Sequence, residues 1–270
     1  MNWQSKRKHR RKEPFEWVFL LLLACVLLYV AANLWAVLTG GLPYLGKALA
    51  DREIRFAIDL SLWTTTLSTV LCVAVGIPCA YLLACTPFRG KRWAEALLEL
   101  PLSMPYLVLG ICLLTLFSSP FGKLLKAWGL KVVFDPVGIV VVHLLINLPF
   151  GIHLATQAFR KLDPELCLTA ETLGASRFQA FWHITLPMCR SDLISAVLLA
   201  WSRGMGEFGA TLMLVGVTRM KTETLPASIY LNISTGDNGM ALAAAFLLLM
   251  LSFAVQGISR LAVKKGSELE

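Results

Sequence analysis

The sequence predicts an all-α, polytopic membrane protein with six transmembrane helices, and three observations lead to this fold class. Of the 270 residues, 57% are hydrophobic and only 16% are charged, against about 25% charged residues in ordinary soluble domains. The mean hydropathy is +0.67. Six stretches approach the length of about 20 apolar residues that a membrane-spanning helix needs: 16–38, 60–85, 98–119, 136–158, 193–216 and 239–261. This composition argues against a soluble enzyme, a nucleic-acid binder and a secreted disulfide scaffold.

The first apolar segment follows a basic tail, which contains Lys6, Arg7, Lys8, Arg10, Arg11 and Lys12. Such a tail resembles the start of a signal peptide. However, the apolar run from Val18 to Val37 is longer than the core of a signal peptide, which has about 7–15 residues. We therefore expect a first helix that is retained in the mature protein.

The distribution of basic residues predicts the orientation of the chain in a cell (inner) membrane. With the N-terminus inside, 16 of the 25 Lys and Arg residues fall on the cytoplasmic side and 8 on the outer side. Because cytoplasmic loops carry the excess of basic residues, both termini are expected in the cytoplasm. The basic tail could instead bind nucleic acid or anionic lipid, although we expect no nucleic-acid partner for the protein.

This orientation divides the chain into four regions. Residues 1–14 form a basic cytoplasmic tail, and residues 15–59 form the first transmembrane helix with its outer loop. Residues 60–262 form the core domain, which contains a long cytoplasmic loop at 159–190, and residues 263–270 form a second cytoplasmic tail.

Four prolines interrupt the apolar segments, at Pro78, Pro101, Pro105 and Pro149. Proline lacks a backbone N–H and kinks a helix, and a membrane tolerates the freed carbonyls only where neighbouring helices or a water-filled cavity satisfy them. Two interpretations remain open: ordinary packing of a helical bundle, or a bundle that lines a pathway and moves.

Familiar catalytic and metal-binding patterns do not fit this sequence. Gly41 to Lys47 has the spacing of a phosphate-binding loop, but Ala48 stands where a magnesium-binding Ser or Thr is needed and an apolar segment precedes the motif. His143 and His153 lie ten residues apart in one segment, and we expect packed or cavity-facing side chains. The seven cysteines form no C-x-x-C pair. We therefore expect no enzymatic activity, disulfide, metal site or cofactor.

The cytoplasmic loop 159–190 contains start and stop signals for two short helices. Asp163, Pro164 and Glu165 suit a helix N-terminus, since Asp can cap, Pro fits the first turn and Glu complements the helix dipole. Gly174 can adopt the left-handed conformation that ends a helix. A second amphipathic stretch should then stop at Pro187. Two short helices projecting from a bundle could fit a groove on another protein or lie on the lipid surface.

The fifth apolar segment contains two charges, Arg203 and Glu207, at positions i and i+4. On a continuous helix they would share one face and could pair. Each charge costs about 2.5–3.5 kcal/mol at mid-membrane, so both should face the interior of the bundle. They form either an ion pair that fixes helix packing or a polar element beside a transport pathway.

The cytoplasmic loop resembles the "EAA" loop of ABC importer permeases. Gly174, nine intervening residues and then Ile184-x-Leu186-Pro187 match its pattern, but Leu168, Thr169 and Ala170 replace the Glu-Ala-Ala triplet, with Glu171 one residue beyond. In this family the loop docks on a separate ATPase subunit. The resemblance implies that role for Asp163, Pro164, Glu165, Thr169, Ala170, Glu171, Gly174, Ala175, Ser176, Ile184, Leu186 and Pro187.

The string from Arg203 to Thr211 resembles permeases of molybdate and sulfate importers, and Thr222 to Tyr230 resembles the molybdate branch. The resemblance implies a homodimer in the lipid bilayer, with two copies of a cytoplasmic ABC ATPase subunit and an extracytoplasmic oxyanion-binding protein. It implies a type I importer fold and translocation of molybdate or tungstate by alternating access, the ATP being hydrolysed by the separate subunit. Alternatives are a sulfate or thiosulfate permease and, in another class, a stand-alone channel or scaffold. The pathway candidates are Arg203, Gly206, Glu207, Gly209 and Thr211.

Overall fold

The computed structural model describes residues 14–267, and in this range the chain is helical and contains no β-strand. The basic tail at 1–13 and residues 268–270 lie outside the described residues. The elements are α1 Pro14–Gly41, a 3₁₀ turn Leu42–Tyr44, α2 Leu45–Ala50, α3 Arg52–Cys85, α4 Lys91–Ser103, α5 Tyr106–Ser118, α6 Pro120–Ala127, α7 Pro136–Arg160, α8 Pro164–Thr172, α9 Arg177–Ala180, a π turn Phe181–Thr185, α10 Leu186–Met188, α11 Arg190–Met205, α12 Gly209–Val215, α13 Leu225–Ser234 and α14 Asn238–Ser267.

Within residues 14–267, four continuous helical stretches are long and apolar enough to cross a membrane. Two bent pairs, α4 with α5 and the stretch 177–188 with α11, raise the number to as many as six. The all-α, polytopic fold class is thereby confirmed. The third segment is not the single helix expected, because α4 and α5 meet at an angle of 112° on either side of Met104 and Pro105. The fifth segment is also broken, between the end of α11 at Met205 and the start of α12 at Gly209.

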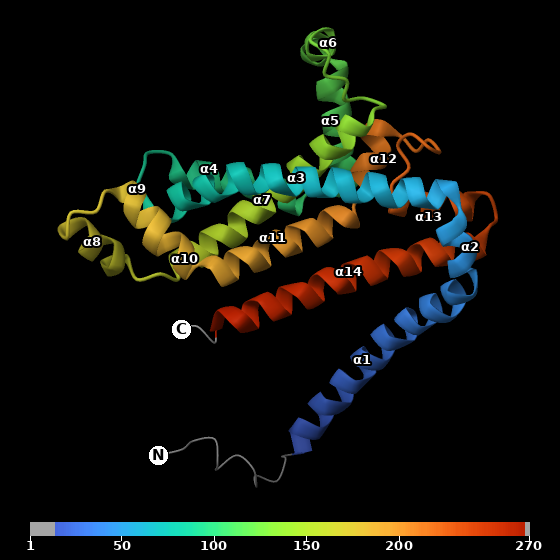
Figure 1. Ribbon diagram of the computed structural model, residues 1–270, viewed down its shortest axis with the longest axis horizontal. Coiled ribbons are helices and arrows are strands. Elements are labelled where there is room, and N and C mark those ends of the chain that lie inside the picture. The colour runs from blue at the N-terminus through green and yellow to red at the C-terminus, as the bar shows by residue number, and fades with distance from the viewer. Residues whose placement is uncertain (1–13, 268–270) are drawn as a thin grey trace.

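Helices α3 and α7 pack together at the centre of the bundle, and α11 packs against both. One apolar cluster joins α5, α7 and α12, and a second joins α3, α7 and α11. In Figure 1, α8 to α10 lie at one end of the bundle and α2 and α13 at the other. The bundle therefore holds the 159–190 loop and the 216–224 loop at opposite ends.

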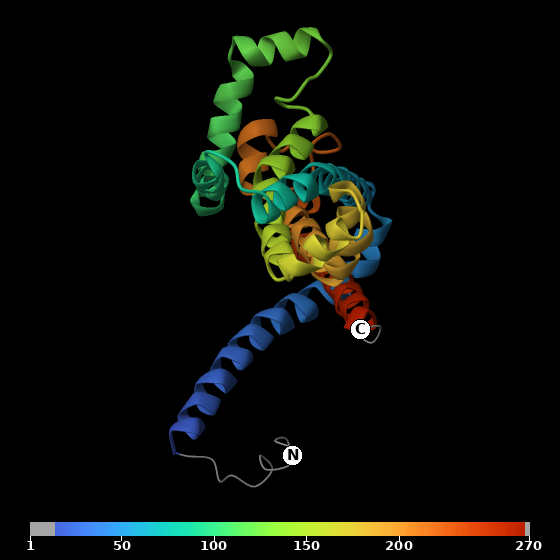
Figure 2. The ribbon, with the colours of Figure 1, turned by 90° about the vertical axis from the view of Figure 1, so that its left-hand side faces the viewer.

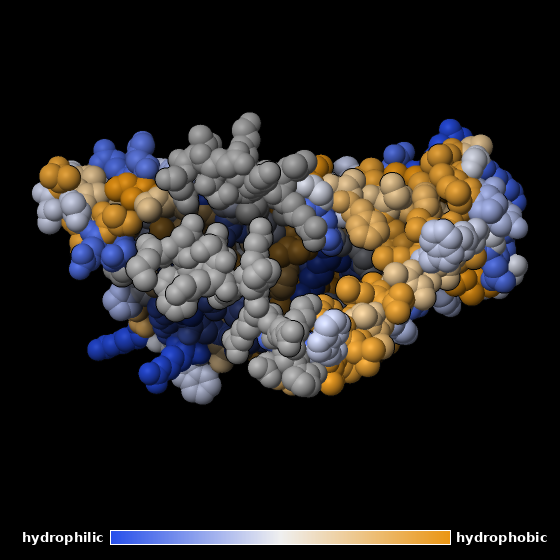
Figure 3. Space-filling model, turned by 90° about the horizontal axis from the view of Figure 1, so that it is seen from below, coloured by the Kyte–Doolittle hydropathy of each residue, from blue (hydrophilic) through white to orange (hydrophobic). Residues whose placement is uncertain are grey.

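Helices α1 and α5 extend away from the bundle in different directions (Figures 1 and 2). The most hydrophobic window of the first span has no residue buried within the chain, and a broad apolar surface is visible from below in Figure 3. This surface includes Phe19, Leu21, Leu28, Tyr29 and Trp35 of α1. Such a surface is stable only against lipid or another protein.

Aspartates begin the helices at both ends of the bundle. Asp51 Oδ1 accepts hydrogen bonds from the N–H groups of Glu53 and Ile54 at 2.8 and 3.1 Å, and Asp135 and Asp163 cap α7 and α8 in the same manner. Each cap satisfies backbone donors that have no partner within the helix. The cap at Asp163 confirms the expected start of α8.

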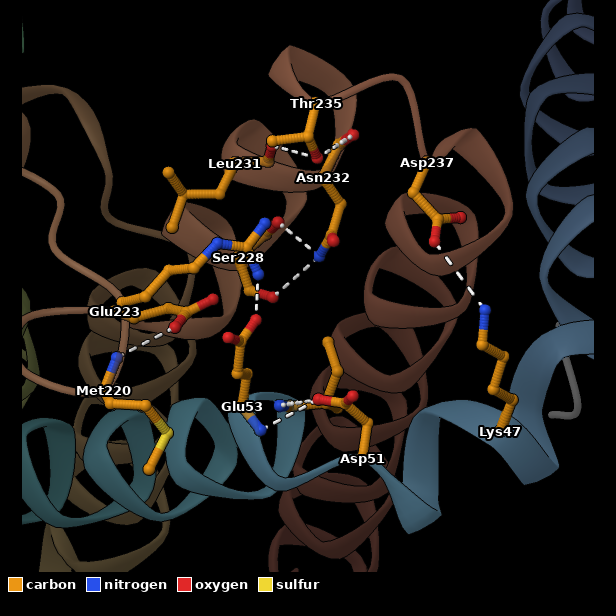
Figure 4. A network of polar contacts seen from close by, with 12 residues as sticks. Lys47, Asp51, Glu53, Met220, Glu223, Ser228, Leu231, Asn232, Thr235 and Asp237 are labelled. Carbon is orange, nitrogen blue, oxygen red and sulfur yellow. Dashed lines mark hydrogen bonds and ion pairs between the residues drawn. The ribbon is translucent and has the colours of Figure 1, made fainter.

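The end of the bundle that contains α2 and α13 is joined by a network of polar contacts (Figure 4). Glu53 of α3 pairs with Arg219 of the 216–224 loop, and Lys47 of α2 lies 3.8 Å from Asp237, at the start of α14. Within the loop, Glu223 is fully buried; its Oε2 accepts a hydrogen bond from Met220 N–H at 3.2 Å, while Oε1 has no partner. Burial therefore raises the pKa of Glu223, although the Met220 N–H opposes this.

The close packing of α5 on α12 predicts that Gly110 cannot be enlarged. A Cβ atom at Gly110 would lie 2.7 Å from the carbonyl oxygen of Ala210 and 2.7 Å from Met213 Cβ, so the two helix backbones would have to separate. We expect Gly110→Ala to lower the free energy of unfolding by about 1–3 kcal/mol, measured by thermal unfolding in detergent. The matched control is Gly151→Ala in α7, where a Cβ meets nothing within 4 Å; equal effects would contradict the packing argument.

The buried carboxyl of Glu223 predicts a specific pH dependence. Its folded-state pKa is raised above the unfolded value of about 4.3, so its stabilising contribution is complete below the unfolded pKa and is lost as pH rises through the folded pKa. Glu223→Gln should therefore gain thermal stability relative to wild type as pH rises from about 4.5 to 8. Glu165→Gln, at an exposed position, should show no such trend; a pH-independent difference for Glu223→Gln would refute the assignment.

Candidate functional site

The knob, defined here as residues 164–188, projects from one end of the bundle and consists of α8, α9, the π turn and α10 (Figure 1). Gly174 has φ +96° and ends α8 as the sequence predicts. Its N–H donates to the carbonyl of Glu171 at 3.0 Å, and the N–H of Ala175 donates to the carbonyl of Ala170 at 3.0 Å. These are the two hydrogen bonds of a Schellman cap, which requires a residue with positive φ at this position.

The second half of the knob begins with a capping box that we did not anticipate from the sequence. The side chain of Ser176 accepts from the Gln179 N–H at 3.3 Å, while the side chain of Gln179 accepts from the Ser176 N–H at 2.8 Å. The spacing Ser-x-x-Gln could have revealed it. The expected stop at Pro187 is wrong by one residue, because helical structure continues to Met188. The π turn Phe181–Thr185 ends two residues before this proline, which has no N–H to donate.

The knob exposes large apolar side chains. Leu173, Phe178 and Trp182 are 83, 70 and 50% exposed, while the small residues Ala170 and Ala180 are buried between the helices. The remaining loop candidates divide into three groups. Asp163, Glu165, Thr169, Ser176 and Pro187 are exposed; Glu171, Ala175, Ile184 and Leu186 are half-buried; and Pro164 begins α8.

Glu171, the acidic residue beside the replaced triplet, has a partner within the knob. Its Oε1 lies 3.6 Å from Nε of Arg177, which belongs to α9. The Arg177 side chain is 78% exposed and that of Glu171 is 35% exposed, so solvent weakens the pair and it contributes little to stability. Because this pair is weak, the Glu171 carboxylate can leave Arg177 and contact a group on another protein.

Aromatic contacts attach the knob to the bundle. Phe181 packs edge-on against Tyr81 of α3 with ring centroids 4.8 Å apart, and Tyr81 packs against Phe159 of α7 at 6.0 Å. On the other side, Phe181 contacts Trp182 at 5.7 Å, and Trp182 contacts Phe178 at 6.1 Å. The exposed aromatic surface of the knob is thus continuous with the two central helices.

Within the membrane segments, Arg203 does not have the surroundings expected from the sequence. Its Nη2 donates to the Tyr106 hydroxyl at 2.7 Å. Its guanidinium carbon lies 4.7 Å from the ring centroid of Phe150 and 5.5 Å from that of Tyr106. Sequence reasoning missed both aromatic residues, because Tyr106 reaches Arg203 through the bend between α4 and α5 and Phe150 through the packing of α7 on α11.

Glu207 does not share a helix face with Arg203, so the i, i+4 arrangement expected from the sequence is wrong. Helix α11 ends at Met205, before Glu207, and no ion pair joins the two charges among residues 14–267. Instead, Glu207 is 4% exposed, and its Oε1 accepts the N–H of Ala210 at 2.8 Å. A carboxylate in this position also interacts favourably with the N-terminal dipole of α12.

The other pathway candidates occupy three different environments. Gly206 is exposed at the end of α11, and Thr211 is buried with its hydroxyl unpartnered. Gly209 begins α12 against α5, where a Cβ would lie 3.5 Å from Tyr106 Cβ. The five candidates therefore mark the break in the fifth segment rather than one continuous helix face.

The two histidines of α7 also differ. His143 is buried and neither of its ring nitrogens has a partner, and the same holds for the side-chain amide of Asn147 one turn later. Gly204 packs against this pair, since a Cβ there would lie 2.8 Å from the Asn147 nitrogen. His153 is exposed and lines a pocket of about 90 Å³ between α3, α4 and α7.

The sequence matches curated transport proteins over most of its length. The chain is 32% identical to the molybdenum transport system permease protein ModB of Mycobacterium tuberculosis, over 90% of this chain and 92% of that protein. It is 30% identical to the sulfate transport system permease protein CysW of Synechocystis, over 87% and 86%. It is 36% identical to the molybdate/tungstate transport system permease protein WtpB of Pyrococcus furiosus, over 64% and 65%.

The fold matches that of a solved importer. The structure resembles a chain of a bacterial alginate ABC transporter solved in complex with an alginate-bound periplasmic protein, with a TM-score of 0.73, 15% identity, and coverage of 90% of this chain and 92% of that one. At this identity the likeness concerns the fold. Residues 75–266 match the model of a family described as the inner membrane component of binding-protein-dependent transport systems. The chain therefore belongs to this family of ABC importer permeases.

Proposed function

We propose that this chain is the permease subunit of an ATP-driven importer that moves a tetrahedral oxyanion, molybdate or tungstate ahead of sulfate, across the inner membrane by alternating access. The observation that carries the proposal is the knob. It is capped at Asp163, Gly174 and Ser176, exposes Leu173, Phe178 and Trp182, and is attached to α3 and α7 by ring contacts. A rigid apolar projection fits a groove on a partner, and its attachment lets a movement of the partner reach the bundle.

In this proposal the knob and both termini lie in the cytoplasm. The excess of basic residues supports that orientation. The architecture is compatible with it, because α1 and α14 both run from the α2 end of the bundle toward the end that carries the knob (Figure 1). The network around Glu53, Arg219 and Asp237 then faces the extracytoplasmic side.

The proposed assembly contains two copies of this chain, two copies of a cytoplasmic ABC ATPase subunit and one extracytoplasmic oxyanion-binding protein. The exposed apolar surfaces of α1 and α5 support contact with a second copy or lipid. The knob supplies the ATPase contact. ATP hydrolysis is assigned to the ATPase because the relatives of this chain are transport permeases.

The substrate ranking rests on the relatives. Proteins named for molybdenum and for molybdate/tungstate transport match at 32 and 36% identity. The CysW relative, at 30%, keeps a sulfate permease as the second candidate. Molybdate, tungstate and sulfate are all tetrahedral dianions, so a pathway that accommodates one is chemically suited to the others.

Gly174 provides a test of the knob. Gly174→Val should abolish association with the ATPase subunit or coupled transport, because a β-branched residue at φ +96° is strained by roughly 1–3 kcal/mol and redirects the chain between α8 and α9. A Cβ there meets nothing within 4 Å, so the effect is on the backbone. Gly174→Asn, which tolerates positive φ better, should retain more function. Co-purification of the ATPase and uptake are measured at equal membrane levels of permease; normal transport by Gly174→Val would refute the docking assignment.

Uptake of labelled anions tests the substrate. Cells that express the full complex should accumulate molybdate in an ATP-dependent manner, and excess tungstate should compete more strongly than excess sulfate. ATP-dependent sulfate uptake that is insensitive to excess molybdate would reverse the ranking. Uptake of none of the three anions would overturn the proposed substrate class.

A further inference from the structure

Arg203 lies in the last turn of α11, two residues before the helix ends at Met205. It is 13 residues beyond the start of α11 at Arg190, which corresponds to about 20 Å along a helix with a rise of 1.5 Å per residue. With the start of α11 at one membrane surface, this position lies inside a hydrocarbon layer about 30 Å thick.

Arg203 retains unused hydrogen-bonding capacity. A guanidinium has five N–H donors. Within residues 14–267, one of its hydrogen bonds is to the Tyr106 hydroxyl, and Nε is buried without a partner. The flanking rings of Tyr106 and Phe150 hold the cation through their faces without consuming its donors.

The charge of Arg203 is not neutralised by an ion pair within the described part of the chain. Glu207 is the nearest acidic residue in the sequence, but its carboxylate is directed to the N–H of Ala210 at the start of α12. Glu207 therefore acts on Arg203 through its charge, without forming an ion pair, and keeps the surroundings from being strongly cationic.

The side chain of Arg203 is only partly buried in the single chain. Exposure of a guanidinium to lipid at this depth is costly, so this face must adjoin a water-filled path or a polar surface of a second copy. Tyr106 and Phe150 belong to this face, and Tyr106 immediately follows the break between α4 and α5. Arg203, Tyr106 and Phe150 therefore lie together on a surface that cannot face lipid.

We infer that Arg203 is a transient binding site for the permeating oxyanion. The Tyr106 hydroxyl accepts the hydrogen bond of the guanidinium when no anion is bound. The inference rests on the proposed function and identifies the residues that contact its substrate. A guanidinium offers two parallel N–H donors to the oxygens of a tetrahedral oxyanion. Exchange between the anion and Tyr106 keeps Nη2 of Arg203 hydrogen-bonded in both states and prevents tight capture, because a permeating ion must leave as readily as it enters.

The test uses the complete complex, with its ATPase and binding protein, reconstituted in proteoliposomes with labelled molybdate. Arg203→Gln should reduce the maximal uptake rate about tenfold, because it removes a hydrogen bond to a charged group. Assembly of the complex and its basal ATP hydrolysis should remain normal. Arg203→Lys should retain part of the rate, since it keeps the charge but loses the planar pair of donors.

Tyr106→Phe separates a role in the pathway from a role in packing. It keeps the ring against Arg203 but removes the competing hydroxyl, so the anion should leave more slowly. The maximal uptake rate should fall several-fold while the half-saturating concentration does not rise. The control is Tyr230→Phe in α13, whose ring contacts Phe208 at 5.4 Å and which should transport normally.

The outcomes distinguish this inference from the proposed function. If the wild-type complex takes up no oxyanion, the proposed function fails. If the wild type transports and Arg203→Gln matches its rate, the inference is overturned and the proposed function stands. If Arg203→Gln does not assemble, Tyr106→Phe decides: an unchanged maximal rate, or a loss explained entirely by lower assembly, overturns the inference.

Discussion

The hydrogen bond from the Ala210 N–H to Glu207 is the interaction on which the centre of this membrane protein depends. A helix broken inside a membrane exposes backbone donors that no solvent can satisfy, and the Glu207 carboxylate supplies a partner at the start of α12. With the break stabilised, α12 packs on α5 so closely that Gly110 has no room for a Cβ. The same interaction directs the Glu207 carboxylate to the start of α12, and Arg203 contacts Tyr106 and Phe150 without an ion pair to Glu207.

A second constraint is that the knob must be rigid although its helices are short. A helix of nine residues such as α8 is not stable alone in water. Caps at Asp163, Gly174 and Ser176 fix the backbone, and Phe181 holds the knob against Tyr81. Because α3 carries Tyr81 at one end and Glu53, paired with Arg219, at the other, a displacement of the knob has a packed route to the polar network at the α2 end of the bundle. That route is the physical basis of the proposed coupling.

Local signals in the sequence predicted much of the fold. The apolar runs located the membrane segments, and Asp163 and Gly174 located the ends of α8, because caps and left-handed residues act within one turn of a helix. The same local reasoning failed at Pro187 and between Arg203 and Glu207. In both cases it assumed regular helix geometry, whereas the chain forms a π turn before Pro187 and ends α11 at Met205.

By itself, the sequence determined the all-α membrane fold, the end of α8 and the family, since these follow from hydropathy, local capping and motif spacing. Only the tertiary structure decided which side chains surround Arg203 and how the knob is attached. Tyr106 and Phe150 are 97 and 53 positions away from it in the chain, and Phe181 meets Tyr81 across 100 positions. No local pattern encodes such contacts, because they arise from helix bends and helix packing rather than from the residues beside them in sequence.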